Sequence, residues 1–249
     1  MGLPTARIVA AGGHEVRGYD IRPLDPQDAE GVTLCASGRE AAAGCELVCL
    51  ALFADEQVEE VLTGPNGLYA ALEPGAVVAI FTTGTIKSAK KLAASAPPGI
   101  SVLDTCFSRA GSMTSDKLNL LVGGDADALR RCATVFDTFA AEVFHLGGSG
   151  AGRAMKLVNN ILWVAHNQLL MDALDFAAAL GFDRHETAKI IDKCTGGSRV
   201  TATFTRPYDD MVAYMRPFMV KDASAAAEAA REVGAGLGTL GDVVRSYLQ

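Results

Sequence analysis

The sequence lacks the features that mark a metal-binding, membrane or nucleic-acid-binding protein. Its six cysteines and four histidines are scattered, and no two cysteines form a CxxC pair, so the ligand spacing of a zinc site is missing. It has no run of about 20 apolar residues to span a membrane, and no basic start followed by an apolar run marks a signal peptide. Its net charge of −7 argues against a nucleic-acid surface. We therefore expect a cytoplasmic protein with reduced thiols and no metal, membrane or nucleic-acid partner.

What the sequence does contain is a regular alternation of apolar strands and amphipathic helices. With 249 residues and 49% hydrophobic composition, the chain can bury a substantial core in one or two domains. Runs such as CELVCLALF are apolar throughout, which is typical of parallel strands buried on both faces. The strands are predicted at 45–53, 76–83, 100–107, 117–124 and 142–147, and the helices between them at 54–62, 86–95 and 127–140. This order predicts a doubly wound α/β sheet of the Rossmann type, with ligands at the carboxyl ends of the strands.

The pattern changes after Gly152. Residues 153–180 form one unbroken helical pattern without Gly or Pro, about 40 Å long at 1.5 Å per residue. From there to residue 249 we expect helices only. The sequence therefore predicts an α/β domain at 1–150 and an all-α domain at 151–249 that begins with the long helix.

The opening of the chain resembles the second part of a nucleotide-binding unit. A helix at 3–11 leads through two glycines into a strand at 15–20. In a dinucleotide-binding fold, a first strand ends in GxGxxG and an acidic residue follows about 20 positions later. Gly2 stands in the place of the third glycine and Asp20 in that of the ribose-binding carboxylate, while the first strand and first two glycines are missing. Asp20 favours NAD because a carboxylate repels a 2′-phosphate, but Arg22 could hold the phosphate of NADP.

Later motifs carry a specific resemblance to a known family. The stretches LDTCFSRAG (103–111), GAGRAMKLVNN (150–160) and FMVKDASAAAEAAREVG (218–234) are ordered and spaced as in the β-hydroxyacid dehydrogenases, and the opening MGLPTA and HEVRGYD fit the same pattern. This is the family of 3-hydroxyisobutyrate dehydrogenase and tartronate semialdehyde reductase, and the resemblance covers essentially the whole chain. It implies NAD(P)-dependent interconversion of a small β-hydroxy acid and its semialdehyde or keto form.

The resemblance also implies roles on the substrate side. Ser108 would bind the substrate carboxylate, Lys156 would be the catalytic lysine, and Asn160 would orient the substrate. A lysine can exchange a proton with the reacting oxygen if burial or a nearby cation lowers its pKa, and residues four apart share one helix face. Arg109 stands where the family more often has glycine, so it could meet a more acidic substrate or pair with Asp104.

On the cofactor side, the resemblance places four residues. Leu52 and Phe53 would lie against the adenosine, Thr83 would line the nicotinamide pocket, and Lys221 would reach the cofactor from the all-α domain. From its local sequence alone, Lys221 is equally compatible with a solvated charge in the first turn of a helix.

Both ends of the chain look clipped relative to this family. Either the start is assigned about ten residues too late for the fold's usual layout, or the protein is a paralogue that binds cofactor poorly. The coherent set of Ser108, Lys156, Asn160 and Lys221 favours the first explanation. Alternatives are a non-catalytic interaction module and an imine reductase, although Lys156 argues against the latter. The resemblance implies a homodimer or homotetramer, and segment 204–218 is expected to contribute to a pocket for the carboxylate-bearing substrate.

Overall fold

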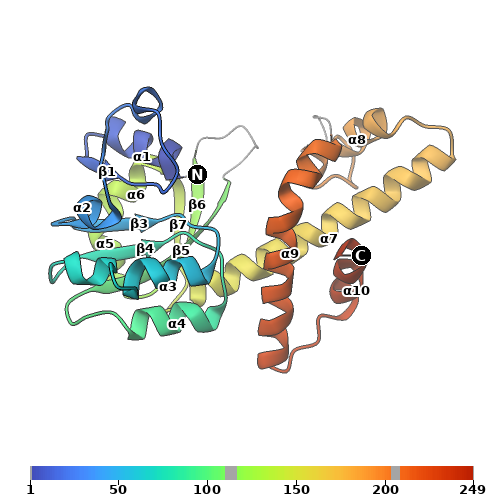
Figure 1. The fold of residues 1–249 in the computed structure, drawn as a ribbon. Coiled ribbons are helices and arrows are strands. Elements are labelled where there is room, and N and C mark those ends of the chain that lie inside the picture. The colour runs from blue at the N-terminus through green and yellow to red at the C-terminus, as the bar shows by residue number, and fades with distance from the viewer. Residues whose placement is uncertain (1, 110–116, 203–207, 249) are drawn as a thin grey trace. The chain divides into compact units, whose positions relative to one another are not determined.

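The structure is a computed structural model that describes residues 2–109, 117–202 and 208–248; of Arg109 and residues 208–213 only the backbone is described. The described residues fall into two compact units, the first ending at Lys156 and the second beginning at Leu157. We call them the α/β unit and the helical unit (Figure 1).

The α/β unit is built on a five-stranded sheet with the order β3-β4-β5-β6-β7. All neighbouring strands run parallel except β5 and β6, which are antiparallel. The strands are β3 (Leu47–Leu50), β4 (Val77–Ile80), β5 (Ser101–Arg109), β6 (Leu118–Gly123) and β7 (Ala140–His145), and the helices around them are α3 (Asp55–Thr63), α4 (Ile86–Ala94), α5 (Ala126–Arg131) and α6 (Ala133–Phe139).

Strand β4, together with Phe81 directly after it, illustrates how the apolar runs form a sheet covered by helices on both faces. Val77, Ala79 and Phe81 enter one hydrophobic cluster with side chains of α5 and α6, whereas Val78 and Ile80 enter a second cluster with side chains of α3 and α4. Alternate residues of a strand point to opposite faces, so a strand covered on both faces must be apolar throughout. Burying a large aliphatic side chain contributes about 1.5–3 kcal/mol, and these two clusters therefore hold the sheet and its helices together. The predicted Rossmann-like fold class is confirmed.

Two short strands form a separate sheet in the described part of the chain. Strands β1 (Val16–Gly18) and β2 (Val32–Leu34) pair in parallel, after helix α1 (Gly2–Ala11) and before helix α2 (Gly38–Ala42). The helix and strand expected at 3–11 and 15–20 are present, the strand in shortened form. Elements β2 and α2 were not predicted, because three to five residues give too little periodicity to detect.

The remaining helices differ little from expectation, with one correction. The long helix is α7 (Ala151–Ala179), followed by α8 (Arg184–Asp192), α9 (Tyr208–Glu232) and α10 (Gly238–Leu248). The single helix expected at 127–140 is wrong, because the chain leaves helical hydrogen bonding at Cys132, which ends α5 and precedes α6. The strand expected at 142–147 begins two residues earlier, as β7. None of the described helices is both long and apolar enough to cross a membrane.

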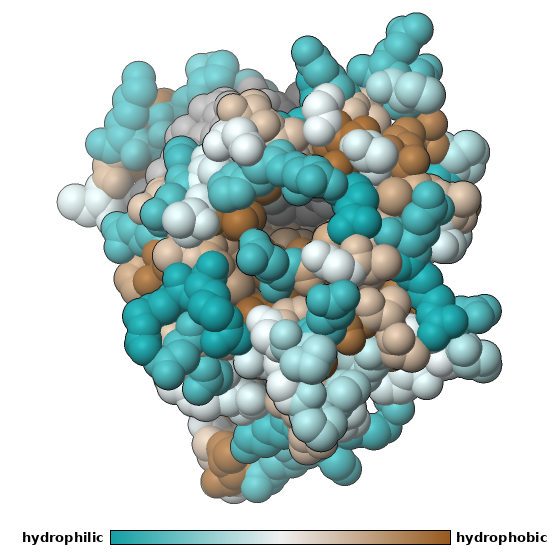
Figure 2. Space-filling view, turned by 90° about the vertical axis from the view of Figure 1, so that its left-hand side faces the viewer, coloured by the Kyte–Doolittle hydropathy of each residue, from teal (hydrophilic) through white to brown (hydrophobic). Residues whose placement is uncertain are grey.

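The surface of the molecule is mostly polar where Figure 2 shows it. Hydrophilic residues predominate on this face, and hydrophobic residues form small groups among them. This polar covering is what the polar sides of amphipathic helices predict.

Candidate functional site

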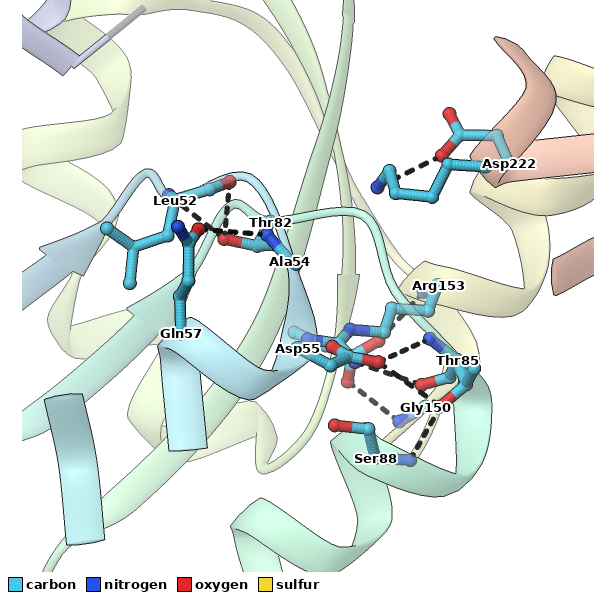
Figure 3. Close-up of polar contacts among 12 residues, drawn as sticks. Leu52, Ala54, Asp55, Gln57, Thr82, Thr85, Ser88, Gly150, Arg153 and Asp222 are labelled. Atoms are coloured by element: carbon cyan, nitrogen blue, oxygen red, sulfur yellow. Dashed lines mark hydrogen bonds and ion pairs between the residues drawn. The ribbon is translucent and has the colours of Figure 1, made fainter. Parts of the chain in front are cut away.

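The loop after β3 is held by side chains rather than by sheet pairing. The Thr82 hydroxyl accepts from the Leu52 N–H and donates to the Leu52 carbonyl oxygen, both at 3.0 Å. Gln57 Oε1 accepts from the N–H groups of Phe53 and Ala54 at 2.9 and 3.2 Å (Figure 3). Leu52 is half-buried and Phe53 is 47% exposed, so the two residues expected beside the adenosine lie on a fixed backbone at a strand's carboxyl end.

The loop after β4 lies against the first turn of α3. Thr83 is half-buried there, next to Thr82. Asp55 Oδ2 accepts from the Thr85 N–H at 2.9 Å and from its hydroxyl at 3.2 Å, and the Thr85 hydroxyl in turn caps α4 at the Ser88 N–H (Figure 3). A side chain at position 84 would collide with the Asp55 carboxylate, which explains the glycine between the two threonines. The two loops expected to meet the cofactor are therefore tied to neighbouring helices.

A buried ionic network joins these loops to the start of α7. Arg153 Nη1 lies 2.7 Å from Asp55 Oδ1 and donates to the Thr85 carbonyl oxygen at 2.9 Å. On β5, the two oxygens of Asp104 accept from the N–H groups of Gly150 and Arg153 at 2.7 and 2.8 Å. These are the otherwise unpaired donors of a helix N-terminus. Burial raises the pKa of Asp104, although the two N–H donors and the Arg153 charge oppose that shift.

The structure brings Lys156 to the end of β5. Lys156 Nζ donates to the Phe107 carbonyl oxygen at 2.7 Å and lies 5.5 Å from the centre of the Phe107 ring. Ser108, the next residue, is half-buried and pairs with Asn119 of β6. Lys156 therefore contacts the residue that directly precedes Ser108 in β5. Arg109 ends β5, but its side chain lies outside the described residues, and so does its expected pairing.

Within the helical unit, Asn160 makes a contact that the sequence reading missed. Asn160 is buried, its Nδ2 donates to Asp222 Oδ2 at 2.5 Å, and its Oδ1 accepts from Asn159 at 2.9 Å. Lys221 Nζ lies 3.2 Å from Asp222 Oδ1 (Asp222 is drawn in Figure 3). Lys221 and Asp222 stand in the middle of α9, so the alternative that placed them in a solvated first turn is wrong.

The residues expected at the ribose form an exposed pair after β1. Arg22 Nε and Nη2 donate to the two Asp20 oxygens at 3.1 and 2.8 Å, and the Arg22 N–H adds a third bond at 2.9 Å. The side-chain hydrogen bond from Arg22 is the main reason why the pKa of Asp20 is lowered. Gly2 begins α1, and a Cβ there would lie at an ordinary 3.7 Å from Ala51 Cβ. Local packing therefore does not by itself demand glycine at position 2.

The described residues contain no candidate metal site. None of their His, Cys, Asp and Glu side chains form a group of three or more that could hold an ion.

Comparisons with known proteins cover both halves of the chain. The family model for the NAD-binding domain of 6-phosphogluconate dehydrogenase matches residues 1–147. The model for NAD-binding of NADP-dependent 3-hydroxyisobutyrate dehydrogenase matches residues 150–249.

Individual proteins agree with these matches. NAD-dependent L-serine dehydrogenase of Pseudomonas aeruginosa is 29% identical over 248 residues, covering 93% of this chain and 82% of that protein. The 3-hydroxyisobutyrate dehydrogenase of the same organism is 29% identical over 80% of this chain and 68% of its own length. The solved structure of the Mycobacterium tuberculosis 3-hydroxyisobutyrate dehydrogenase with L-serine superposes with a TM-score of 0.78 at 27% identity, over 99% of this chain and 89% of that one.

Proposed function

This chain belongs to the β-hydroxyacid dehydrogenase family, and from that premise we propose a substrate class and a role for each site residue. The chain is an NAD(P)-dependent hydroxyacid oxidoreductase. We infer that its substrate is a small β-hydroxy acid, oxidised to the semialdehyde or keto acid, with Lys156 as the general base in that direction and the general acid in reverse.

The position of Lys156 is the observation that carries this proposal. Its ammonium nitrogen is anchored on the Phe107 carbonyl oxygen, one residue from Ser108. A proton-transfer group is useful only within hydrogen-bond reach of the reacting oxygen. A substrate whose carboxylate accepts the Ser108 hydroxyl would present its β-hydroxyl group close to that anchored nitrogen. The names of similar proteins support a β-hydroxy acid as the class of substrate, because L-serine and 3-hydroxyisobutyrate are both β-hydroxy acids.

In the proposed oxidation, the Lys156 amine removes the proton of the substrate hydroxyl as the carbon loses its hydride. When bound, the oxidised nicotinamide supplies the hydride acceptor. In reduction, the Lys156 ammonium donates the proton to the carbonyl oxygen. Asn160, one helical turn after Lys156 on α7, would donate to the same substrate, and Asp222 would hold the Asn160 amide in the orientation that allows this.

The residues present fit a dinucleotide. Leu52 and Phe53 offer apolar surface for the adenosine, and Thr83 offers a hydroxyl toward the nicotinamide. Asp20 would accept from the ribose hydroxyls, with Arg22 deciding how well a 2′-phosphate is tolerated. Gly2 would stand near the pyrophosphate at the N-terminus of α1, and Lys221 would contact the cofactor from the helical unit.

We also propose that the active protein is a cytoplasmic homodimer or homotetramer. Helix α7 carries exposed apolar side chains seven residues apart: Leu162, Leu169 and Phe176, which are 48%, 52% and 67% exposed. Such spacing places them on one helix face, which a second copy could cover. Light scattering should show a multimer for the wild type and a monomer for Leu169→Glu.

Cofactor binding and turnover test the proposed function. Titration with NADH and NADPH, followed through Trp163 fluorescence or by calorimetry, should give micromolar dissociation constants for at least one of them. L-serine, 3-hydroxyisobutyrate and other β-hydroxy acids should then reduce the oxidised cofactor, whereas lactate, an α-hydroxy acid, serves as the control and should not. Neither nucleotide binding nor turnover with any β-hydroxy acid would contradict the proposal.

A further inference from the structure

Arg153 is a charged side chain enclosed completely by protein. Its exposure is 0%, and it is the largest fully buried side chain among the described residues. Removing a guanidinium from water is costly unless its donors and its charge are satisfied. Asp55 supplies the opposite charge at 2.7 Å, but Nε and Nη2 have no hydrogen-bond partner within the described ranges. Buried donors without partners weaken a fold, so stability alone does not explain this arginine.

The pair of Arg153 and Asp55 connects three segments that are distant in the sequence. Asp55 is the first residue of α3 and directly follows the loop after β3. Its Oδ2 accepts from the N–H and the hydroxyl of Thr85, which follows β4. Arg153 lies in the first turn of α7 and binds both Asp55 and the Thr85 carbonyl oxygen. Gly84 allows the close approach at Asp55, because a Cβ there would collide with the Asp55 carboxylate. Gly152 lets the first turn of α7 lie against β5 and β6, because a Cβ there would collide with the carbonyl oxygens of Asp104 and Leu121.

The connected segments are those that carry the proposed chemistry. Thr83, assigned to the nicotinamide pocket, precedes Thr85 by two residues, and Lys156 follows Arg153 by three, which is about one helical turn. Hydride transfer is sensitive to small errors in the placement of the reacting groups. We propose that Arg153 and Asp55 are positioning residues that lock the loops after β3 and β4 to the first turn of α7 and so align Lys156 with the nicotinamide pocket. This inference rests on the proposed function.

The chain offers a matched control for this pair. Lys91 Nζ lies 2.5 Å from Glu59 Oε1 and joins α4 to α3 on the surface, where the two side chains are 63% and 45% exposed. Both residues of this ion pair lie within helices, Glu59 in α3 and Lys91 in α4, and neither belongs to the loops after β3 and β4. Lys91→Met therefore removes one cation that pairs with α3 without altering the proposed lock, and its kinetics should match those of the wild type.

The test combines hydrogen exchange with steady-state kinetics on the full chain. In Arg153→Met, the amide of Thr85 should exchange at least about tenfold faster, because Asp55 loses the partner that fixes it. The kcat should fall about 10- to 100-fold, while KM for the hydroxy acid changes less than about threefold, since the substrate-binding groups stay. Arg153→Lys, which keeps a cation for Asp55, should recover part of the kcat.

A second variant provides the same test if Arg153→Met does not fold. Asp55→Asn keeps oxygen and nitrogen atoms at nearly the same positions but removes the charge that faces Arg153, and it should reproduce the same split between kcat and KM. Wild-type kcat together with wild-type exchange at Thr85 in either folded variant would overturn the inference. If the wild-type chain has no turnover, the proposed function fails, and the exchange rate at Thr85 alone decides whether the lock exists.

Discussion

Two arginine–carboxylate pairs in the α/β unit have the same chemistry and opposite surroundings. Arg153 and Asp55 approach to 2.7 Å with side chains 0% and 17% exposed. Arg22 and Asp20 approach to 2.8 Å with side chains 80% and 31% exposed. In water, the exposed pair contributes little to folding and opens readily, whereas the enclosed pair cannot separate without leaving a charge in the interior.

This difference assigns each pair a task. The enclosed pair holds backbone segments in place, and each of its partners belongs to a different loop or helix. The exposed pair follows β1 at the expected ribose end of the site. There the Asp20 carboxylate and the Arg22 guanidinium can give up their mutual hydrogen bonds and bind a ligand instead. The two pairs have nearly the same distance between their charged atoms, so this distance does not indicate the role of an ion pair. The exposure of the side chains separates them. Substitutions in each pair test whether exposure separates their roles.

The largest effect on stability should come from breaking the enclosed pair. Arg153→Met leaves Asp55 as an uncompensated buried charge, so we expect the free energy of unfolding of the α/β unit to fall by about 3–5 kcal/mol. Urea unfolding followed by circular dichroism measures this loss. The double variant Arg153→Met with Asp55→Leu should recover part of it. Arg22→Met is the matched exposed variant, and an equal loss there would break the comparison.

A smaller loss is expected from the carboxylate that caps α7. Asp104→Asn places an amide nitrogen against one of two backbone N–H donors, so the free energy of unfolding should fall by about 1–3 kcal/mol.

The pH dependence of that variant has a defined sign. Burial raises the pKa of Asp104 above its ordinary value of 3.8, so the folded state holds this proton more tightly than the unfolded state. The stability that Asp104 contributes through this proton is therefore present in full below pH 3.8 and decreases as pH rises through the folded-state pKa. Unfolding measured across the acid range should show this decrease in the wild type and not in Asp104→Asn. The opposite slope would indicate that the two N–H donors outweigh burial.

At the exposed pair, the expected change is in cofactor preference rather than stability. Asp20→Asn removes the carboxylate that repels a 2′-phosphate and releases Arg22, so the affinity ratio of NADPH to NADH should rise about tenfold. Calorimetric titration of both nucleotides measures the ratio. Arg22→Gln, with Asp20 in place, should lower the same ratio. A lost cofactor site in either variant, or an unchanged ratio in both, would remove this pair from the ribose end.

The smallest expected effect is a difference in alkylation rate between a buried and an exposed cysteine thiol. Burial raises the pKa of Cys132 to about 11, whereas Cys194 is exposed. Since the thiolate is the reactive form, iodoacetamide at a mildly alkaline pH should modify Cys194 well before Cys132. Peptide mass spectrometry over a time course measures the order. Faster modification of Cys132 would show that the core around α5 and α6 opens easily.

Much of the fold followed from sequence pattern. Apolar runs predicted the strands of the five-stranded sheet, and the unbroken pattern at 153–180 predicted α7 to within two residues. The roles that the motifs imply for Lys156 and Ser108 stay predictions, although Lys156 does contact Phe107, the residue before Ser108. The short elements β2 and α2 were missed, because a three-residue strand has no measurable period.

The enclosed network could not be predicted in the same way. Arg153 and Asp55 are 98 residues apart, and Asn160 and Asp222 are 62 residues apart, so only the folded chain pairs them. One signal was available in the sequence: Asp104 is a charged residue in the middle of a predicted buried strand. A buried carboxylate needs donors, and here they come from the N-terminus of a helix that begins more than 40 residues later.

The measurement that tests the central claim most directly is the comparison of turnover and cofactor affinity in Lys156→Ala. If Lys156 transfers the proton, kcat should fall about a thousandfold, while the dissociation constant of the preferred nucleotide stays within about threefold of the wild-type value. Turnover at the wild-type rate, or loss of cofactor binding in a variant that remains folded, would contradict the role assigned to Lys156.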